Sequence, residues 1–572
     1  MSRSSSALLR GCVAAFMVTA VFTIGASSAS AVSYSWLPKA GSGDWTTSVN
    51  WSGTTSTDLY PGSTTATDTV SLNGDLTGDM VVNLDTSVSI QNLFLGDIAQ
   101  TASTFNTTTI STTNGSSLTF NSTTGTSALS MPGGVNAGAE NVIAPNIALT
   151  AGTLEFRNNT TSGGGANGRY NLALTGDVTS GTTGGHILRF TYAGNSSGTL
   201  SADFRGNITS GPGVVSIFFR KDNTTTGIRQ LKLSGTGNTF SGVIDIRGGQ
   251  SNAIVESSPA SGTNGALGTG RIDLGISGSS ATLNLGGSLS TVTEVNGINI
   301  VGTGARRIAV IGAGNRILSG TVNQSTSGGL TLACSDAGDL TFSNVISGNG
   351  QITINSTGSG RVIFGGNNTN TAALTVAAGK FQLDGSLSSS SSLSVATAGI
   401  LGGTGTASGG ATISGGTLSP GSTTGVLTLG SLTLTATSTA LIDLLAAGTR
   451  GTDYDGVSIL NAGGLTYGGT MAFAFGGSAL PDNTTFNVFS FTGSPSGSFG
   501  QVSSTGFYAG TWTDNANGTY SLASGGKTLT FTQATGNVLV VPEPASIALL
   551  GVGVGVAFAA ARRRSFLKRN PS

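Results

Sequence analysis

Residues 233–246, with the sequence LSGTGNTFSGVIDI, indicate the fold most directly, because two short runs of alternating apolar and polar residues flank a turn of glycine, asparagine and threonine. Alternation with a period of two is typical of a β-strand that buries one face. The pattern returns loosely in residues 363–369 (IFGGNNT) and 374–383 (LTVAAGKFQL). Short strands with glycine-rich corners occur in sandwiches, barrels and solenoids, and internal repetition is what distinguishes a solenoid.

The same pattern of short alternating runs separated by glycine-rich turns extends over most of the chain, from about residue 68 to residue 540. No segment of this region shows helical periodicity over ten or more residues, so we expect an all-β protein with almost no helix before the C-terminal tail. The clearest alternating runs are residues 69–72, which we take as the first strand, and 118–120, 231–233, 243–246, 282–285 and 427–429.

Residues 230–475 resemble the autotransporter-associated β-strand repeat, in which an apolar strand is followed by S-G-x-N-T-F-S-G, a second strand and A-G-x-[LF]-x-L. The resemblance implies a right-handed parallel β-helix, a solenoid whose rungs are about 4.8 Å apart. Alternate apolar side chains would stack inside it, and Gly, Asn or Ser would occupy corners that need positive φ. At about 20 residues per coil, we expect roughly 16 coils and a rod ~75 Å long.

Irregular segments flank the expected β-helix of residues 71–475, and we assign them as caps that prevent aggregation through the open ends. The C-terminal cap is residues 476–540. The N-terminal cap, residues 32–70, is rich in tryptophan. Its indoles could form an aromatic plug over the first coil or an exposed platform that stacks on sugars. These tryptophans are Trp36, Trp45 and Trp51.

The composition is unusual for its low charge. Only 9% of the 572 residues are charged, and 91 residues are glycine, whereas about 25% charged residues is usual. The 25 basic and 25 acidic residues leave a formal net charge of 0. This balance argues against nucleic acid or an anionic surface as the main partner.

The N-terminus predicts export. Arg3 and Arg10 precede an apolar run at residues 11–25, and the small residues Ala29 and Ala31 form a cleavage pattern, so residues 1–31 are predicted to be a secretory signal peptide. Its removal would leave a single cysteine and therefore no internal disulfide.

The C-terminus, residues 541–572, is predicted to be a sorting signal. An apolar stretch at residues 545–561 is just long enough to cross a ~30 Å hydrocarbon core, and arginines beyond it favour the cytoplasmic side. A plain tail anchor has the same apolar and basic parts. With the short motif before it, the segment resembles the PEP-CTERM signal of Gram-negative bacteria. That resemblance implies transient insertion of a single transmembrane helix in the inner membrane, cleavage near the motif by an exosortase, and final location at the cell surface or outside the cell. The motif is Val541, Pro542, Glu543 and Pro544, and the basic stop is Arg562, Arg563 and Arg564.

Candidate catalytic residues are few. His186 is the only histidine, so the chain alone cannot build a histidine-based metal site, and a Ser-His-Asp triad would have to use this residue. Cys334 occupies an apolar strand position, which favours a buried inert thiol over a nucleophile. Asp453 and Asp455 lie two positions apart and could bind calcium or act as an acid and base, but a structural corner is the favoured interpretation. We therefore assign no catalytic, metal or cofactor-binding residue and expect no cofactor.

These observations lead to a non-enzymatic, exported structural protein of the extracellular matrix, envelope or adhesion surface. The expected partners are an exosortase-type membrane enzyme and, as one possibility, an extracellular polysaccharide. A polysaccharide lyase or hydrolase on the same scaffold is the alternative, although scaffold analogy is a weak argument. Ice binding by the threonine-rich residues 107–113 is a minor alternative, because no regular T-x-T ladder accompanies them.

Overall fold

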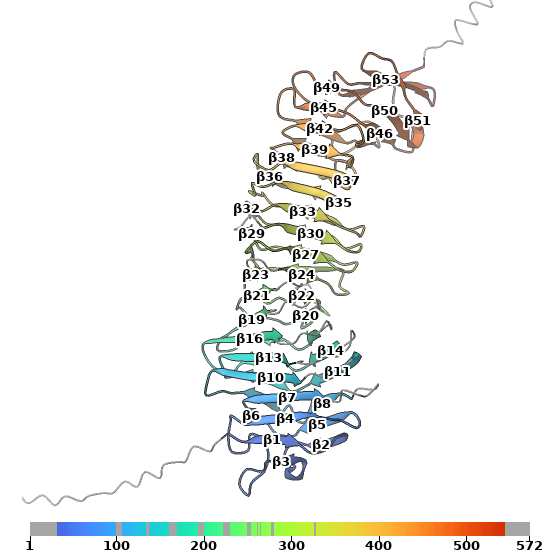
Figure 1. Ribbon diagram of the computed structural model, residues 1–572. Helices are drawn as coiled ribbons and strands as arrows, with labels where there is room; N and C mark the ends of the chain where they lie inside the picture. Colours follow the sequence, from blue (N-terminus) through green and yellow to red (C-terminus); the bar gives the residue numbers. More distant parts are fainter. Residues whose placement is uncertain are drawn as a thin grey trace, which may run out of the picture.

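Short strands stack into an elongated rod in the computed structural model of the chain (Figure 1). The expected signal peptide lies outside the described residues except for Ala31, and so does the apolar stretch 545–561. Within the described part of the chain, no helix has the length and apolar character needed to cross a bilayer. The described residues are 31–98, 106–132, 137–159, 169–192, 200–220, 229–248, 253–259, 261–262, 265–275, 280–324 and 328–543.

Three parallel ladders run along the rod, and the chain visits them in the same order in each coil. The first ladder begins with β1 (Ser33–Trp36), β4 (Thr69–Gly74), β7 (Asn92–Asp97), β10 (Thr126–Pro132), β13 (Thr153–Asn159), β16 (Gly185–Tyr192), β19 (Val214–Arg220), β21 (Ile244–Arg247), β23 (Ile272–Leu274), β26 (Ile298–Ile300), β29 (Val322–Gln324) and β32 (Ile346–Gly348). It continues through a bridge between Asn367 and Ser386 into β36 (Ser386–Leu387), β38 (Thr406–Ala407), β41 (Val426–Leu429), β44 (Gly456–Ile459) and β48 (Phe489–Ser490).

The second ladder carries the next strand of each coil. Its members are β2 (Gly41–Asp44), β5 (Met80–Leu84), β8 (Thr108–Thr112), β11 (Ala137–Ile143), β14 (Arg169–Leu174), β17 (Leu200–Phe204), β20 (Arg229–Leu233), β22 (Ala253–Ser257), β24 (Ala281–Leu285), β27 (Arg306–Val310), β30 (Leu330–Cys334), β33 (Ile352–Asn355), the first halves of β35 (Leu374–Leu383) and β37 (Leu393–Gly402), then β39 (Ala411–Ser414), β42 (Leu432–Leu434), β45 (Leu465–Tyr467) and β49 (Ser496–Gly497).

The third ladder carries the last strand of each coil. It contains β6 (Val88–Ile90), β9 (Ser117–Phe120), β12 (Asn146–Leu149), β15 (Val178–Ser180), β18 (Ile208–Thr209), β25 (Thr291–Glu294), β28 (Asn315–Leu318), β31 (Leu340–Phe342), β34 (Arg361–Phe364), the second halves of β35 and β37, then β40 (Thr417–Leu418), β43 (Thr439–Leu444), β46 (Thr470–Phe475) and β50 (Gln501–Thr505). Three parallel ladders wound from one chain are the architecture of a parallel β-solenoid.

The interior is a set of apolar columns, because alternate residues of each strand point inward and neighbouring strands pair in register. Ile272 pairs with Ile298, and both are buried. Phe156 and Phe190 stack with ring centroids 4.5 Å apart and an interplanar angle of 7°. The alternation seen in the sequence is therefore the inside–outside alternation of the rungs.

Coil length varies more than the sequence suggested. Hydrogen bonds between adjacent rungs join residues 19 positions apart at Ser394 and Thr375, but 30 apart at Ile208 and Asn238 and 36 apart at Ala128 and Asn92. The expectation of about 20 residues per coil is thus wrong for much of the rod. The extra residues lie in the connections between strands, where added chain costs little because it stays outside the stack.

The N-terminal end of the rod is closed by aromatic side chains. The ladder begins earlier than expected, since β1 already pairs in parallel with β4, and β3 (Trp51–Ser52), preceded by the 3₁₀ turn η1 (Ser48–Asn50), pairs antiparallel to β1. The Trp51 ring meets Trp36 and Trp45 edge to face at centroid distances of 4.7 and 5.0 Å. All three indoles are buried. An aromatic plug requires this burial, whereas a sugar-stacking platform requires exposed indole faces.

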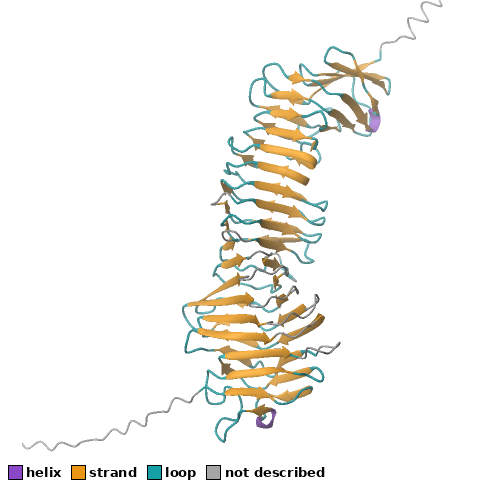
Figure 2. Cartoon of the chain, viewed as in Figure 1, coloured by secondary structure: helices purple, strands orange, loops and turns teal. Residues whose placement is uncertain are grey.

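An antiparallel sheet covers the last rungs at the other end (Figure 2). Phe531 packs against Tyr467, Phe473 and Phe499 of the final coils, and the Tyr520 hydroxyl donates to the Phe499 carbonyl at 2.6 Å. The sheet consists of β47 (Thr484–Asn487), β55 (Asn537–Pro542), β54 (Lys527–Thr532), β53 (Thr519–Ser524) and β52 (Thr513–Asp514), beside β51 (Gly510–Thr511), η2 (Gly506–Tyr508) and β50.

Candidate functional site

A groove of about 570 Å³ lies on the third ladder, across β34, β35, β37, β40 and β43. Its volume is within the range of small-molecule sites, roughly 300–1,000 Å³. Its lining includes Asp339, Arg361, Lys380, Gln382, Ile400, Gly402, Thr417, Ser419, Ser422 and Leu441.

Strand register assembles the groove from residues far apart in sequence. Arg361 pairs with Lys380, Lys380 with Ile400, and Ile400 with Thr417, so one outward column crosses four successive rungs. The intervening residue Phe381 points into the core and is 1% exposed. Alternation along β35 thus holds the polar side chains outside while the aromatic ring anchors the strand.

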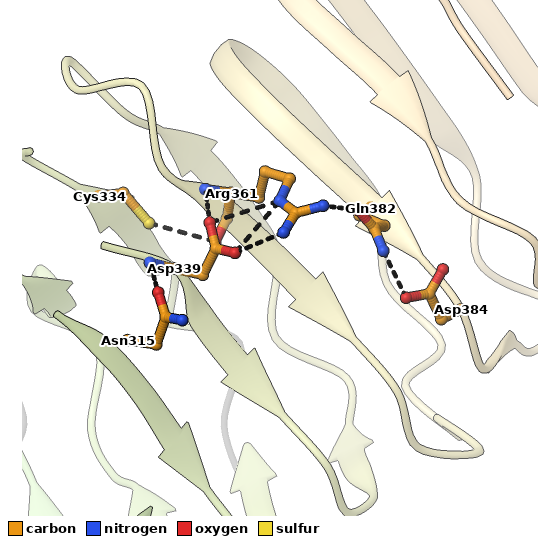
Figure 3. Close-up of polar contacts among 6 residues, drawn as sticks. All are labelled: Asn315, Cys334, Asp339, Arg361, Gln382 and Asp384. Atoms are coloured by element: carbon orange, nitrogen blue, oxygen red, sulfur yellow. Dashed lines mark hydrogen bonds and ion pairs between the residues drawn. The ribbon is translucent and has the colours of Figure 1, made fainter. Parts of the chain in front are cut away.

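A row of charged and amide groups forms one side of the groove (Figure 3). Arg361 Nη2 donates to Asp339 Oδ2 at 2.7 Å, and Arg361 Nη1 donates to Gln382 Oε1 at 2.7 Å. Gln382 Nε2 then donates to Asp384 Oδ2 at 2.6 Å. The hydrogen bond to Asp339 raises the pKa of Arg361. The row is therefore held in one geometry by its own contacts.

Close backbone packing creates the hollow beside this row. A Cβ atom on Gly402 would lie 2.8 Å from the Ser419 carbonyl oxygen and 3.0 Å from that of Gly421, so no side chain fits at this outward position. Reciprocal backbone hydrogen bonds between Gly403 and Gly421, of 3.0 and 2.8 Å, hold the neighbouring turn. Gly421 itself has φ +73°, which favours glycine.

The groove also offers polar groups that are free to bind. Within the described chain, the ammonium of Lys380 and the hydroxyls of Thr417, Ser419 and Ser422 make no hydrogen bond to a protein group. Lys380 and Ser422 are exposed. Ile400 and Leu441 add half-buried apolar surface. This arrangement can bind a ligand with several hydroxyl groups and one anionic group.

Sequence reasoning missed this site entirely. Its only signal was the spacing of three polar residues: Asp339 and Arg361 are separated by 22 positions, and Arg361 and Gln382 by 21. Those separations become meaningful only when the coil length in this region is known.

His186 has a structural environment on β16. Its Nδ1 lies 2.9 Å from the Ala151 carbonyl oxygen and its Nε2 lies 3.0 Å from that of Thr182. The side chain is 3% exposed. Both ring nitrogens thus face backbone carbonyls rather than a substrate groove.

Asp453 and Asp455 bind separate backbone amides around β44. Asp455 accepts hydrogen bonds from the amides of Gly425 and Asp443 at 2.8 and 2.9 Å, while Asp453 accepts from the Thr449 amide at 2.6 Å. Burial raises the pKa of Asp455 to about 7. Among the described residues, no group of three or more His, Cys, Asp or Glu side chains is placed to hold a metal ion. These contacts fit a structural corner.

Cys334 is buried on β30, next to Arg361 of the charged row (Figure 3). Its thiol donates to the Arg361 carbonyl at 3.3 Å, and burial raises the pKa of the thiol to about 11. The thiol is therefore protonated near neutral pH and weakly nucleophilic.

The first residues of the sorting motif belong to the C-terminal sheet. Val541 and Pro542 pair with Thr528 and Lys527, and the Glu543 amide donates to the Gly526 carbonyl at 3.3 Å. The remaining predicted residues lie outside the described chain; they are Pro544, Arg562, Arg563, Arg564 and Ala29.

Comparison with known families supports the sorting signal. Residues 540–564 match the family described as the PEP-CTERM protein-sorting motif. No curated protein matches the chain. The motif marks an exported protein that is sorted by an exosortase, which is a membrane enzyme. The chain is thus an exported parallel β-solenoid with a PEP-CTERM tail.

Proposed function

We propose that this protein is a non-enzymatic structural rod of a Gram-negative cell surface or extracellular matrix. The observation that carries the proposal is that the sorting signal follows the rod directly. The PEP-CTERM match begins at residue 540, inside the last strand, β55. The sorting signal is therefore continuous with the β-solenoid, and the solenoid is the part of the protein that is exported.

The physical character of the rod supports a structural role. Its core consists of stacked apolar columns, and its outward positions are mostly uncharged, in keeping with 9% charged residues in the chain. A neutral surface rich in hydroxyl and amide groups offers hydrogen-bond donors and acceptors to a hydrated polysaccharide. The resemblance of residues 230–475 to autotransporter-associated repeats favours the same role, and with it a right-handed passenger-type helix.

Processing leaves the rod intact in this proposal. The apolar tail resides in the inner membrane until the exosortase cleaves near the motif. Since β55 is paired with β54 as far as Pro542, a cut at or beyond Pro542 preserves every rung and the covering sheet. The released chain then carries no membrane span.

The sorting proposal is tested by replacing Pro542, Glu543 and Pro544 with alanine and following the fractions in which the protein accumulates. The unprocessed chain should remain with the membrane. Ser524→Ala, in the hairpin next to the motif, is the matched control and should be processed normally. Normal processing and release of the triple variant would contradict the proposal.

The structural role has a separate test against the enzymatic alternative. The purified protein is incubated with acidic and neutral polysaccharides, and reducing ends and unsaturated products are measured. We expect no turnover. Turnover that disappears in Asp453→Asn would instead establish a lyase or hydrolase.

A further inference from the structure

We propose that the groove across β34, β35, β37, β40 and β43 binds an acidic oligosaccharide, with a sugar carboxylate at Lys380. The proposal deepens the proposed function, because it supplies the point at which an exported rod contacts extracellular polysaccharide. Binding in the groove does not depend on how the protein is exported.

Charge within the groove selects an anion. Arg361 and Lys380 are the two cations of the lining. The Arg361 guanidinium is neutralised by Asp339 at 2.7 Å, whereas Lys380 is exposed and has no hydrogen-bond partner in the described chain. The ammonium of Lys380 is therefore the group available to a ligand, and it favours a carboxylate through charge-assisted hydrogen bonds.

The remaining lining selects a ligand rich in hydroxyl groups. Thr417, Ser419 and Ser422 each present a hydroxyl that can both donate and accept. Ile400 and Leu441 add apolar surface to the groove. A sugar ring has this combination of polar edges and apolar faces, whereas an acidic peptide has few hydroxyls to match the three side chains.

The dimensions favour an oligosaccharide over a single sugar. The groove runs across five rungs of the third ladder, which at ~4.8 Å per rung spans about 19 Å. Its side formed by Asp339, Arg361 and Gln382 is already ordered by mutual hydrogen bonds. A preordered surface loses little conformational entropy when a ligand binds.

Isothermal titration of the full chain, purified in mild detergent, tests the proposal with three probes: the trimer of galacturonic acid, the neutral trimer of galactose with the same linkage, and triglutamate. We expect the acidic trimer to bind most tightly and to weaken with added salt. Lys380→Met, which retains the aliphatic stem, should weaken its binding about tenfold. Lys39→Met, at an exposed lysine near the other end of the rod, should leave binding unchanged.

A second variant tests the location independently of charge. Ser419→Phe projects a ring into the groove and should abolish binding of the acidic trimer, with circular dichroism and the melting temperature confirming that the variant is folded. Absence of binding at millimolar acidic trimer, equal binding by Lys380→Met, or undiminished binding by folded Ser419→Phe would overturn the proposal. Equal binding of triglutamate would overturn the assignment of a saccharide. Failure of the sorting test leaves all of these results unaffected.

Discussion

Ser257 donates a hydrogen bond to the carboxylate of Glu294 inside the rod, where the Glu294 side chain is only 1% exposed. Burial raises the pKa of Glu294 to about 7, although the Ser257 hydroxyl, nearby backbone amides and the charge of Arg316 act in the opposite direction. Arg316 is itself buried, and its guanidinium donates to the Gly286 carbonyl at 2.5 and 3.0 Å. The core thus contains ionisable groups among its apolar columns.

These groups predict that the rod loses stability as pH rises from about 4 to about 7. Glu294 and Asp455 both have folded-state pKa values raised to about 7, so the folded chain binds more protons than the unfolded chain in this range. The free energy of unfolding then falls with increasing pH and levels off above pH 7, by roughly 3–4 kcal/mol per group. Denaturant titrations at pH 5 and pH 8 measure the difference.

Glu294→Gln should remove the part of this pH dependence that belongs to Glu294. Glu155→Gln is the contrasting control, because hydrogen bonds from Thr191 and Arg157 outweigh burial and lower the pKa of Glu155. Stability due to Glu155 is lost only as the pH falls through its lowered pKa, so it has the opposite pH dependence to that of Glu294. Equal stability of the wild-type protein at pH 5 and pH 8 would contradict the prediction.

Phe190→Ala should lower the free energy of unfolding by about 3–5 kcal/mol, the usual cost of removing a buried aromatic side chain. Phe190 is 2% exposed and contacts the rings of Phe156, Phe204 and Phe219. Thermal and chemical denaturation provide the measurement. Thr353→Ala, at a half-buried outward position of β33, should change stability by less than about 0.5 kcal/mol.

Trp51→Ala should unfold the N-terminal rungs selectively. Trp51 contacts the Trp36 and Trp45 rings and donates through Nε1 to the Trp45 carbonyl at 2.7 Å. In a solenoid each coil interacts mainly with its neighbours, so the defect should decay along the rod. Hydrogen exchange should accelerate in β1 and β4 but remain slow in β43 and β46. Uniform acceleration along the chain would show that the rod unfolds as one cooperative unit.

Cys334 should react with a thiol reagent only after unfolding. Burial and a pKa of about 11 keep the thiol protonated and covered in the folded rod. Labelling by Ellman's reagent is measured with and without denaturant, in a chain that carries Cys12→Ser so that a single thiol remains. Rapid labelling of the folded protein would show that β30 opens readily.

Strand identity followed from local pattern, with exceptions that have a physical cause. Residues 69–72, 282–285 and 427–429 lie in β4, β24 and β41, because period-two alternation is a property of the strand itself. β2 has the sequence GSGD and no apolar side chain. It is a strand because it pairs with β5, a non-local contact that leaves no periodicity in the sequence.

By itself, the sequence determined the all-β character, the low charge and the sorting signal, since each depends on residues that are neighbours along the chain. Only the tertiary structure decided which coils are long, that Glu294 and Arg316 are buried, and that Arg361 and Lys380 line one groove. The reason is that the number of residues in each connection sets the register between rungs. That register, rather than local propensity, determines which outward side chains become neighbours.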